Sequence, residues 1–493
     1  MAKLTFKSSL EYSEATFSWI VTAGIAVILL LSSYDLWTQA VRPSVLIIAL
    51  VYLLFALLQL GLAWRIRNDI ARSGAIRSST RALGYIQLLS LFSGNLFITA
   101  SALHLIKRDR NTEYTLAVYT LLTGLFVIAI SALNLFKPYV ADTFLPAISL
   151  LLITTGFHLI SLLLVARFMK GRIAAPWLSP VAILLILTSV TGNLFALLLG
   201  INLLIKIRHN GKPATAKWEE VWGKLTRSTT SMIGLFFIVF LFSMAVCSYF
   251  TFDYAMATEN NYSAILQHPS LAYPLGTDNF GRCLFTRIVF GARISLIVGF
   301  FSTLIPVVIG GALGAISGYY GRRTDNIIMR LLDVLYAIPG ILLAIAIIAA
   351  FGANTFNLII ALSVGAIPTY ARTMRANVLL VSTFEYVEAA RALGTRDLLI
   401  IIKHIIPGSL APMIVKSTLT IGAAVISTSS LSFLGLGVEP HIPEWGNILK
   451  LGSTYLESHS YLAIYPGLAI ILLVLSFNFL GDGLRDALDP KLG

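Results

Sequence analysis

Long apolar runs constrain the fold of this chain more than any other feature of its sequence. A helix that crosses a bilayer needs about 20 apolar residues, and it satisfies its own backbone hydrogen bonds on the way. About twelve segments meet that requirement, which predicts an all-α polytopic membrane protein. The predicted spans are 17–36, 44–64, 83–106, 114–136, 144–168, 178–205, 231–250, 292–319, 330–351, 355–378, 409–435 and 461–481.

Composition supports this class. The chain is 57% hydrophobic and 12% charged, with a mean hydropathy of +0.84. The net charge of +13 would suggest nucleic acid in a water-soluble protein, but here it fits basic loops on the cytoplasmic side of a membrane. We therefore expect no nucleic-acid partner. The 2 cysteines exclude a disulfide framework. Cys247 and Cys283 could pair in principle, but two unrelated thiols are favoured.

The chain divides near residue 210. We predict a six-helix membrane domain at 1–208, a polar linker at 209–227 and a second membrane domain at 228–493. The linker is predicted to form an amphipathic helix anchored by Trp218 and Trp222. The first apolar run follows Lys3 and Lys7 without a convincing cleavage site, so we interpret it as an uncleaved first span.

Loop charges predict the orientation. Residues 251–281 contain no Lys or Arg, whereas basic residues occupy the alternate loops. The positive-inside rule then places both termini and the loop at 379–408 in the cytoplasm. Arg282, Arg287 and Arg293 lie on the outer side, against the rule, and we expect them in a folded outer loop at 251–290.

A polar segment, 385–407, separates two long apolar stretches. Ser382 and Glu385 have the spacing of a capping box, which predicts a helix start there. Gly394 is expected to end this helix after about eleven residues in a left-handed conformation. Thr395 is predicted to cap a second helix, with Asp397 in its first turn, that runs towards Pro407.

This segment resembles the EAA loop of ABC-importer permeases. It contains Glu388-Ala389-Ala390, then Gly394, then Ile406-Pro407 at the spacing of that family. The resemblance implies a helix that fits into a cleft on a cytoplasmic ATPase, where small alanines allow close approach and Glu388 and Arg391 offer charge. An ordinary interfacial helix is the alternative. The predicted coupling residues are Glu385, Glu388, Ala389, Ala390, Arg391, Gly394, Asp397 and Pro407.

The second half resembles the C-type permease subunit of dipeptide, oligopeptide and nickel ABC importers. The ordered segments Pro274–Asp278, Gly291–Leu296, Leu431–Val438 and Gly481–Pro490 carry the resemblance, together with Pro443-Glu444-Trp445-Gly446. It implies six helices of a type I importer permease core. The sequence departs from the family at Cys283, usually acidic there, and at Thr286, commonly Ser. The larger departure is the extra N-terminal region.

The resemblance also implies the partners. These are a second homologous permease, two cytoplasmic ATPase subunits, an extracellular binding protein and the lipid bilayer of a bacterial cytoplasmic membrane. No G-x-x-x-x-G-K-[ST] loop occurs, so ATP and magnesium are expected on the partner ATPases and no cofactor on this chain. We predict no catalytic residue and no metal site: His104 and His158 lie in apolar spans without ligands at metal spacing.

Several alternatives stay open from the sequence. Short peptides are the expected cargo, with nickel or another small solute as the alternative. Twelve spans also describe a secondary transporter of two similar halves, and an assembly or sensory role is a third possibility. Two outer-loop motifs are candidate binding-protein contacts, although turn structure is the favoured interpretation. They comprise Gly276, Thr277, Asp278, Gly281 and Arg282.

Further patterns concern packing and ancestry. Gly310, Gly311, Gly314 and Gly318 predict a small-residue helix-packing face. Arg330 and Asp333, three residues apart, are expected to pair on one helix face. In the first half, Ser93-Gly94-Asn95-Leu96-Phe97 recurs 98 residues later as Thr191-Gly192-Asn193-Leu194-Phe195. This repeat suggests a duplicated three-span unit with inverted copies, in a domain that scaffolds or regulates the core from its periphery.

Overall fold

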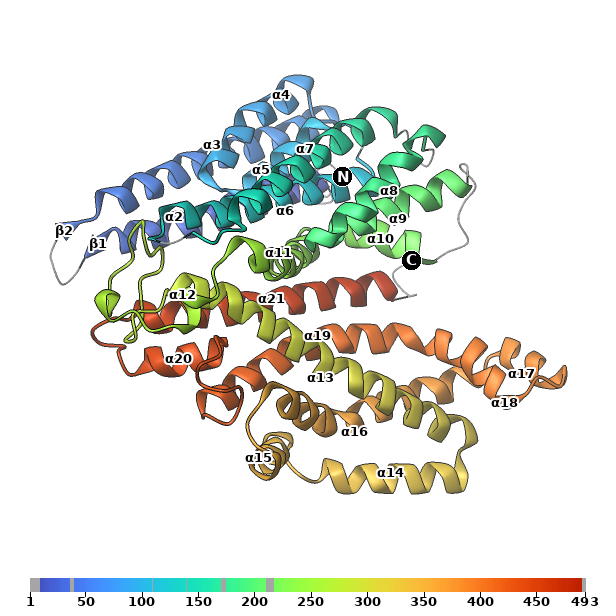
Figure 1. Ribbon diagram of the computed structural model, residues 1–493. Coiled ribbons are helices and arrows are strands. Elements are labelled where there is room, and N and C mark those ends of the chain that lie inside the picture. Colours follow the sequence, from blue (N-terminus) through green and yellow to red (C-terminus); the bar gives the residue numbers. More distant parts are fainter. Residues whose placement is uncertain are drawn as a thin grey trace. The chain divides into compact units, whose positions relative to one another are not determined.

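The computed structural model describes residues 9–35, 40–108, 110–138, 140–169, 174–209 and 217–489, and most of them are helical (Figure 1). The described strands are the short pair β1 (Tyr34–Asp35) and β2 (Ala40–Val41). Contacts divide the chain into two units, 1–128 with 150–229 and 129–149 with 230–493. Lys3, Lys7 and residues 210–216 of the predicted linker lie outside the described residues.

The first unit contains two successive sets of helices. The first set is α2 (Leu10–Ser32), α3 (Pro43–Ser73), α4 (Ser78–Gln87), the 3-10 turn η1 (Leu88–Ser93) and α5 (Leu96–Ile106). The second set is α6 (Thr112–Ala132), α7 (Phe144–Phe168), η3 (Pro176–Leu178), α8 (Ser179–Thr188), η4 (Ser189–Thr191) and α9 (Leu194–His209). The end of α6, the 3-10 turn η2 (Leu133–Phe136) and the start of α7 belong to segment 129–149, which groups with the second unit. Helix α10 (Lys217–Leu225) follows in the linker.

The predicted spans 83–106 and 178–205 are helical hairpins. In each, a glycine with positive φ ends a 3-10 turn, at +70° for Gly94 and +80° for Gly192. The first hairpin closes on itself, because Arg81 Nη1 donates to the carbonyl of Leu105 at 2.8 Å. In the second, a Cβ at Gly200 would lie 2.7 Å from the Ala182 carbonyl. The chain therefore leaves each hairpin at the end where it entered.

In both sets, the asparagine at the hairpin tip donates to a threonine of the first helix, to its hydroxyl in one set and to its carbonyl in the other. Asn95 Nδ2 donates to Thr22 Oγ1 at 3.1 Å, and Asn193 Nδ2 donates to the carbonyl of Thr120 at 2.9 Å. Each asparagine is 73 residues from its threonine partner, and that threonine lies in the first helix of the same set. The structure therefore supports the duplication suggested by the Gly-Asn-Leu-Phe repeat.

The predicted inversion of the copies is wrong. Each copy has two long helices and a returning hairpin, so that the chain crosses an even number of times. Both copies then begin at one end of the unit: Glu14, in the first turns of α2, contacts Arg110, just before α6, at 2.5 Å. The repeat is parallel because glycine and asparagine break the third apolar segment at its centre.

The second unit contains the permease-like helices and segment 129–149. Its long helices are α11 (Thr229–Thr251), α13 (Leu284–Tyr320), α16 (Thr355–Val381), α19 (Ile406–Phe433) and α21 (Tyr461–Leu488). The shorter elements are α12 (Ala255–Thr258), η5 (Tyr262–Ala264), α14 (Arg322–Tyr336), α15 (Gly340–Phe351), α17 (Glu385–Ala392), α18 (Asp397–Ile400), a π-helical turn (Ile401–Ile405) and α20 (Trp445–Ser453). Helices α14 and α15 replace the predicted straight span 330–351 and meet at a bend of 80°.

The predicted glycine packing face is confirmed for Gly310, Gly314 and Gly318, whereas a Cβ at Gly311 would face Met413 of α19 at 3.6 Å. A Cβ at Gly310 would lie 2.7 Å from the Ile367 carbonyl, and one at Gly314 would lie 2.3 Å from the Ala371 carbonyl. A Cβ at Gly318 would meet the Arg375 carbonyl at 3.0 Å. These missing side chains let the backbones of α13 and α16 pack in direct contact, as small residues do in membrane helix pairs.

Arg330 and Asp333 do not form the predicted pair. Arg330 Nε donates to Asn326 Oδ1 at 2.8 Å, while Asp333 Oδ1 accepts from Arg372 Nη2 at 2.6 Å. Asp325 accepts two bonds from Arg375 Nε and Nη2, at 2.5 and 2.6 Å. The carboxylates of α14 therefore face the arginines of α16, because tertiary packing outweighs the weak pairing along one exposed helix.

The all-α polytopic class is confirmed. Within the described residues, 8 helices are long and apolar enough to cross a membrane, or 9 if the bent pair α14–α15 forms one span. The remaining apolar segments are the two hairpins of the first unit. Cys247 and Cys283 are both buried and no disulfide joins them, which agrees with the interpretation of two unrelated thiols.

The duplicated hairpin tips predict matched effects of mutation. Asn95→Ala and Asn193→Ala should each lower the stability of the protein in detergent by about 1–2 kcal/mol, since each loses buried hydrogen bonds. The measurement is the Tm of the purified variants, with Asn260→Ala in the exposed outer loop as the control. A large loss for one tip and none for the other would contradict the equivalence of the copies.

Candidate functional site

The first helix of the predicted coupling loop is α17, and it is shorter than expected. It spans 8 residues, Glu385–Ala392, and its N-cap is Phe384, without a side-chain bond. The capping box prediction is wrong: Ser382 is the C-cap of α16, and its hydroxyl donates to the Val378 carbonyl at 2.7 Å. The preceding helix therefore uses the serine that the sequence pattern assigned to α17.

The predicted end of this helix is confirmed. Gly394 has φ +76° and follows the C-cap Leu393. The amide of Gly394 donates to the Arg391 carbonyl at 3.0 Å, and that of Thr395 donates to Ala390 at 3.2 Å. These two bonds form a Schellman motif, in which glycine takes the left-handed position. The glycine thus turns the chain sharply between the two loop helices.

The second loop helix differs from its prediction in its N-cap, and it runs to Pro407 as predicted. Arg396, with extended backbone, is the N-cap in place of Thr395, although Asp397 does lie in the first turn. Pro407 does not end this helix. The π-helical turn Ile401–Ile405 accommodates the proline within a continuous helix, which extends into α19. A proline clashes with the carbonyl four residues earlier, and the wider turn relieves that clash.

The loop has a buried face and an exposed face. Val387, Ala390, Ile400, Ile401 and Ile405 are buried in one cluster with residues of α13, α16 and α19. On the other face, Leu393 is 86% and Leu398 66% exposed. The polar or small residues on the exposed surface are Glu385, Glu388, Ala389, Arg391, Gly394, Asp397 and Pro407. The exposed face of the loop therefore carries charged, small and apolar side chains together.

Tyr319 links both loop helices to the end of α13. Its hydroxyl donates to Asp397 Oδ1 at 2.6 Å, and the Arg391 guanidinium lies 5.5 Å from the centre of its ring. Contact with the Tyr319 hydroxyl, and the negative charges of Asp397 and Glu388, raise the pKa of Arg391, which is therefore cationic. Sequence reasoning missed Tyr319, because nothing in the local pattern distinguishes it from an interfacial aromatic residue.

The five outer-loop candidates are all buried inside the loop. Thr277 Oγ1 donates to the Ala264 carbonyl, and Asp278 accepts from the amides of Phe280 and Arg282, both at 2.9 Å. Gly276 and Gly281 have φ +81° and +74°, and a Cβ at Gly281 would lie 1.7 Å from the Asn261 carbonyl. These contacts support the turn interpretation, while binding-protein contact by these residues stays a prediction.

The outer arginines that oppose the positive-inside rule are held by the protein. Arg282 Nε donates to Asp278 Oδ2 at 2.8 Å. Arg287, 1% exposed, donates to the Ala257 carbonyl at 2.8 Å, with its Nε 3.7 Å from Asp278. Arg293 donates to Ser248 and Ala245. Their charges are paired with a carboxylate or hydrogen-bonded within the protein. We therefore expect these arginines to influence the membrane orientation less than loop arginines without such partners.

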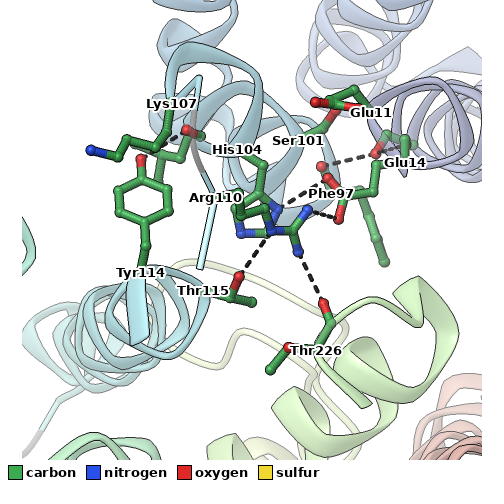
Figure 2. Close-up of polar contacts among 12 residues, drawn as sticks. Glu11, Glu14, Phe97, Ser101, His104, Lys107, Arg110, Tyr114, Thr115 and Thr226 are labelled. Carbon is green, nitrogen blue, oxygen red and sulfur yellow. Dashed lines mark hydrogen bonds and ion pairs between the residues drawn. The ribbon is translucent and has the colours of Figure 1, made fainter. Parts of the chain in front are cut away.

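The first unit contains a buried charge cluster that the sequence did not reveal. Glu14 contacts His104 Nδ1 at 3.1 Å and Arg110 Nη1 at 2.5 Å (Figure 2). Arg110 also donates to Thr115 Oγ1 at 2.9 Å and to the Thr226 carbonyl at 3.1 Å. His104 has no acidic neighbour in the sequence, because its partner Glu14 lies 90 residues away. Among the described residues, no group of three or more potential ligands could hold a metal ion.

Together, the apolar helices and the exposed loop that joins α16 to α19 define a multi-pass membrane protein. Comparison identifies its family. Residues 310–493 match the family described as binding-protein-dependent transport system inner membrane component. Residues 217–269 match the N-terminal TM domain of oligopeptide transport permease C.

Individual relatives support the same family. The chain is 42% identical over 281 residues to the glutathione transport system permease protein GsiD of Pectobacterium atrosepticum, covering 57% of this chain and 93% of the relative. It is 42% identical over 279 residues to the dipeptide transport system permease protein DppC of Alkalihalophilus pseudofirmus, covering 57% and 91%. The chain therefore belongs to the inner-membrane permease family of ABC importers, as a C-type subunit with an extra N-terminal region.

This assignment confirms the predicted family and excludes the secondary-transporter alternative. A solved structure of the MetNI methionine ABC transporter in an inward-facing conformation aligns with 41% of this chain and 97% of its own at 22% identity. Its TM-score of 0.35 is too low to carry further argument.

The left-handed glycine of the loop gives a direct structural prediction. Gly394→Val should destabilise the loop by about 1–2 kcal/mol, because a β-branched residue is strained at positive φ. Faster hydrogen exchange of the amides between Glu385 and Ile400, at unchanged exchange in α13, is the expected readout. Gly467→Val is the control, since that glycine is helical and has open space around its Cβ position. Equal protection in both variants would show that the turn does not need glycine.

Proposed function

We propose that this permease imports short peptides and that its loop 379–408 couples ATPase closure to alternating access. The observation that carries the proposal is the exposed, charged surface of α17, fixed to the membrane helices from behind. Its buried face packs in one cluster with α13, α16 and α19. A force on this surface is therefore transmitted to three long helices.

Two contacts provide the transmission. The Tyr319 hydroxyl binds Asp397 at 2.6 Å, which ties α13 to the start of the second loop helix. That helix runs through its π-helical turn into α19 without a break. When two partner ATPases close on bound ATP, α17 moves with the cleft that holds it, and α13 and α19 tilt. The cavity opens outward, and hydrolysis returns it to the inward-facing state.

The partners follow from the family. A second homologous permease completes the translocation path, and an extracellular binding protein delivers the cargo. ATP and magnesium bind to the ATPase subunits, and this chain carries no catalytic residue. Both termini lie in the cytoplasm, in the orientation that the loop charges favour. Residues 1–208 scaffold or regulate the core from the periphery of the path.

Peptide cargo is supported by the relatives, whose names specify glutathione and dipeptide transport. Both are small zwitterionic molecules with peptide bonds. Nickel is the second candidate, because the C-type family includes nickel importers. No group of three or more potential metal ligands occurs in the described part of this chain, although the path also includes a second chain.

Charge reversal at the exposed loop surface tests the coupling role. Glu388→Lys should reduce ATP-driven uptake at least tenfold, because a loss of about 1.4 kcal/mol in the ATPase contact is already tenfold. Insertion and thermal stability should not change, since Glu388 is exposed. The assay is uptake and substrate-stimulated ATPase activity of the reconstituted complex. Glu457→Lys, at an exposed glutamate that follows α20, is the matched control. Full activity of Glu388→Lys would contradict the coupling role of this loop.

Competition tests the cargo. Uptake of a labelled dipeptide into proteoliposomes should be inhibited by a mixed pool of di- to hexapeptides and should require ATP. It should also survive collapse of the proton gradient, because the driving force is nucleotide. Ni²⁺ that competes better than the peptide pool would overturn peptide cargo while leaving the importer class intact.

A further inference from the structure

A pocket of about 640 Å³ lies in the second unit at the end opposite the coupling loop. It is lined by the end of α11, the first turns of α13, and the short segments 141–143, 252–254 and 442–443. Arg293 lies 26 residues before Tyr319 on the same helix, which places the pocket about 40 Å from the loop. The pocket therefore lies near the end of α11 and the start of α13, where two candidate membrane spans end and begin.

The polar wall of the pocket carries charges of both signs. The Arg293 guanidinium lies 3.4 Å from the centre of the Tyr249 ring and 4.2 Å from that of Phe290. Its Nε and Nη2 donate to Ser248 Oγ at 3.0 and 2.8 Å, which fixes the plane of the group. Asp142 and Asp253 supply carboxylates to the same lining. A fixed guanidinium suits a phosphate, and the carboxylates suit an ammonium group.

The other wall is apolar and continues along the membrane span. Ile294 and Ile297 line the pocket below Arg293. From Ile297 an exposed stripe follows on the same face of α13, at helical spacings of four, seven and eleven residues. Its members and their exposed fractions are Ile297 43%, Phe301 44%, Leu304 39% and Val308 61%. A ligand of this pocket thus meets charges at one end and an exposed apolar surface at the other.

We propose that the pocket binds an aminophospholipid of the phosphatidylethanolamine type. The lipid phosphate pairs with Arg293, its primary ammonium pairs with Asp142 and Asp253, and an acyl chain follows the stripe from Ile297 to Val308. A zwitterionic peptide would match the charges but not the apolar stripe within a membrane span. The proposal depends on the proposed orientation of the protein only for the choice of leaflet, which is the outer one.

The N-terminal region helps to build this site. Segment 141–143 follows a stretch that is anchored on the permease core: Asn134 Nδ2 donates to the Thr251 carbonyl at 2.7 Å, and Lys137 contacts Thr286 Oγ1. The Lys137 ammonium also lies 5.1 Å from the centre of the Phe252 ring and 5.3 Å from that of Phe285. Family matches begin at residue 217, so the Asp142 carboxylate comes from outside the family's core. A lipid bound here would bridge the extra region and that core.

Native mass spectrometry of the full-length protein from nanodiscs tests the proposal. Nanodiscs with equal phosphatidylethanolamine and phosphatidylglycerol should release protein that retains phosphatidylethanolamine preferentially. Asp142→Asn should lower this preference about fivefold, the effect of losing roughly 1 kcal/mol. Glu259→Gln, an exposed outer-loop carboxylate away from the pocket, should leave it unchanged. Arg293→Gln should reduce retention of both lipids, and Arg293→Lys should restore part of it.

Three results would overturn the lipid assignment. Equal retention of the two lipids by the wild-type protein would remove the ammonium site. An unchanged preference in Asp142→Asn would exclude that carboxylate as a ligand. Displacement of the lipid by millimolar dipeptide, or by phosphoethanolamine without acyl chains, would show that the pocket serves a soluble zwitterion. None of these measurements depends on uptake, so their outcome is independent of the proposed cargo.

Discussion

The direct backbone contact between α13 and α16 is the interaction on which the permease unit depends. Three glycines on α13 leave no side chain at the crossing, so that carbonyls of α16 occupy the space a Cβ would need. Membrane helices gain little from apolar burial against each other, and close packing of small residues replaces that driving force. Arg372 and Arg375, on the same α16, bind the carboxylates of α14. One tightly packed helix pair therefore positions both the bent α14–α15 segment and, through Tyr319, the coupling loop.

Local signals in the sequence predicted the features that depend on local chemistry. The apolar runs gave the helices, the glycine spacing gave the packing face, and Gly394 gave the left-handed turn that ends α17. Predictions failed where a side chain could form one of two alternative local interactions. Ser382 fits a capping box, but the preceding helix extends far enough to use its hydroxyl first. The second loop helix does run to Pro407 as predicted, but its continuation through a π-helical turn into α19 was not predicted. Sequence spacing cannot decide between such competing partners, because the decision lies in tertiary packing.

The parts of the candidate site that sequence reasoning missed are all long-range contacts. Tyr319 meets Asp397 across 78 residues, and Lys137 meets Thr286 across 149. The outer arginines show the converse. Their number argued weakly against the predicted orientation, and their internal partners now explain why they are compatible with it. A count of charges treats every loop arginine as free, whereas the structure separates free arginines from those already bound within the fold.

The parallel duplication explains how the N-terminal region holds the linker. Because both copies begin and end at the same end of the unit, the buried acids Glu14 and Glu113 gather there with the ends of α5 and α9. Through Arg110, the Glu14 cluster binds the Thr226 carbonyl at 3.1 Å. Through Lys206, which lies 2.7 Å from Glu113 and 3.8 Å from Glu219, the second copy reaches helix α10. Inverted copies would have placed these two charge clusters at opposite ends, and only one could have met the linker. The chain passes from Thr226 directly into α11, the first helix of the permease unit, so each copy contributes one polar attachment to the segment that connects the two domains.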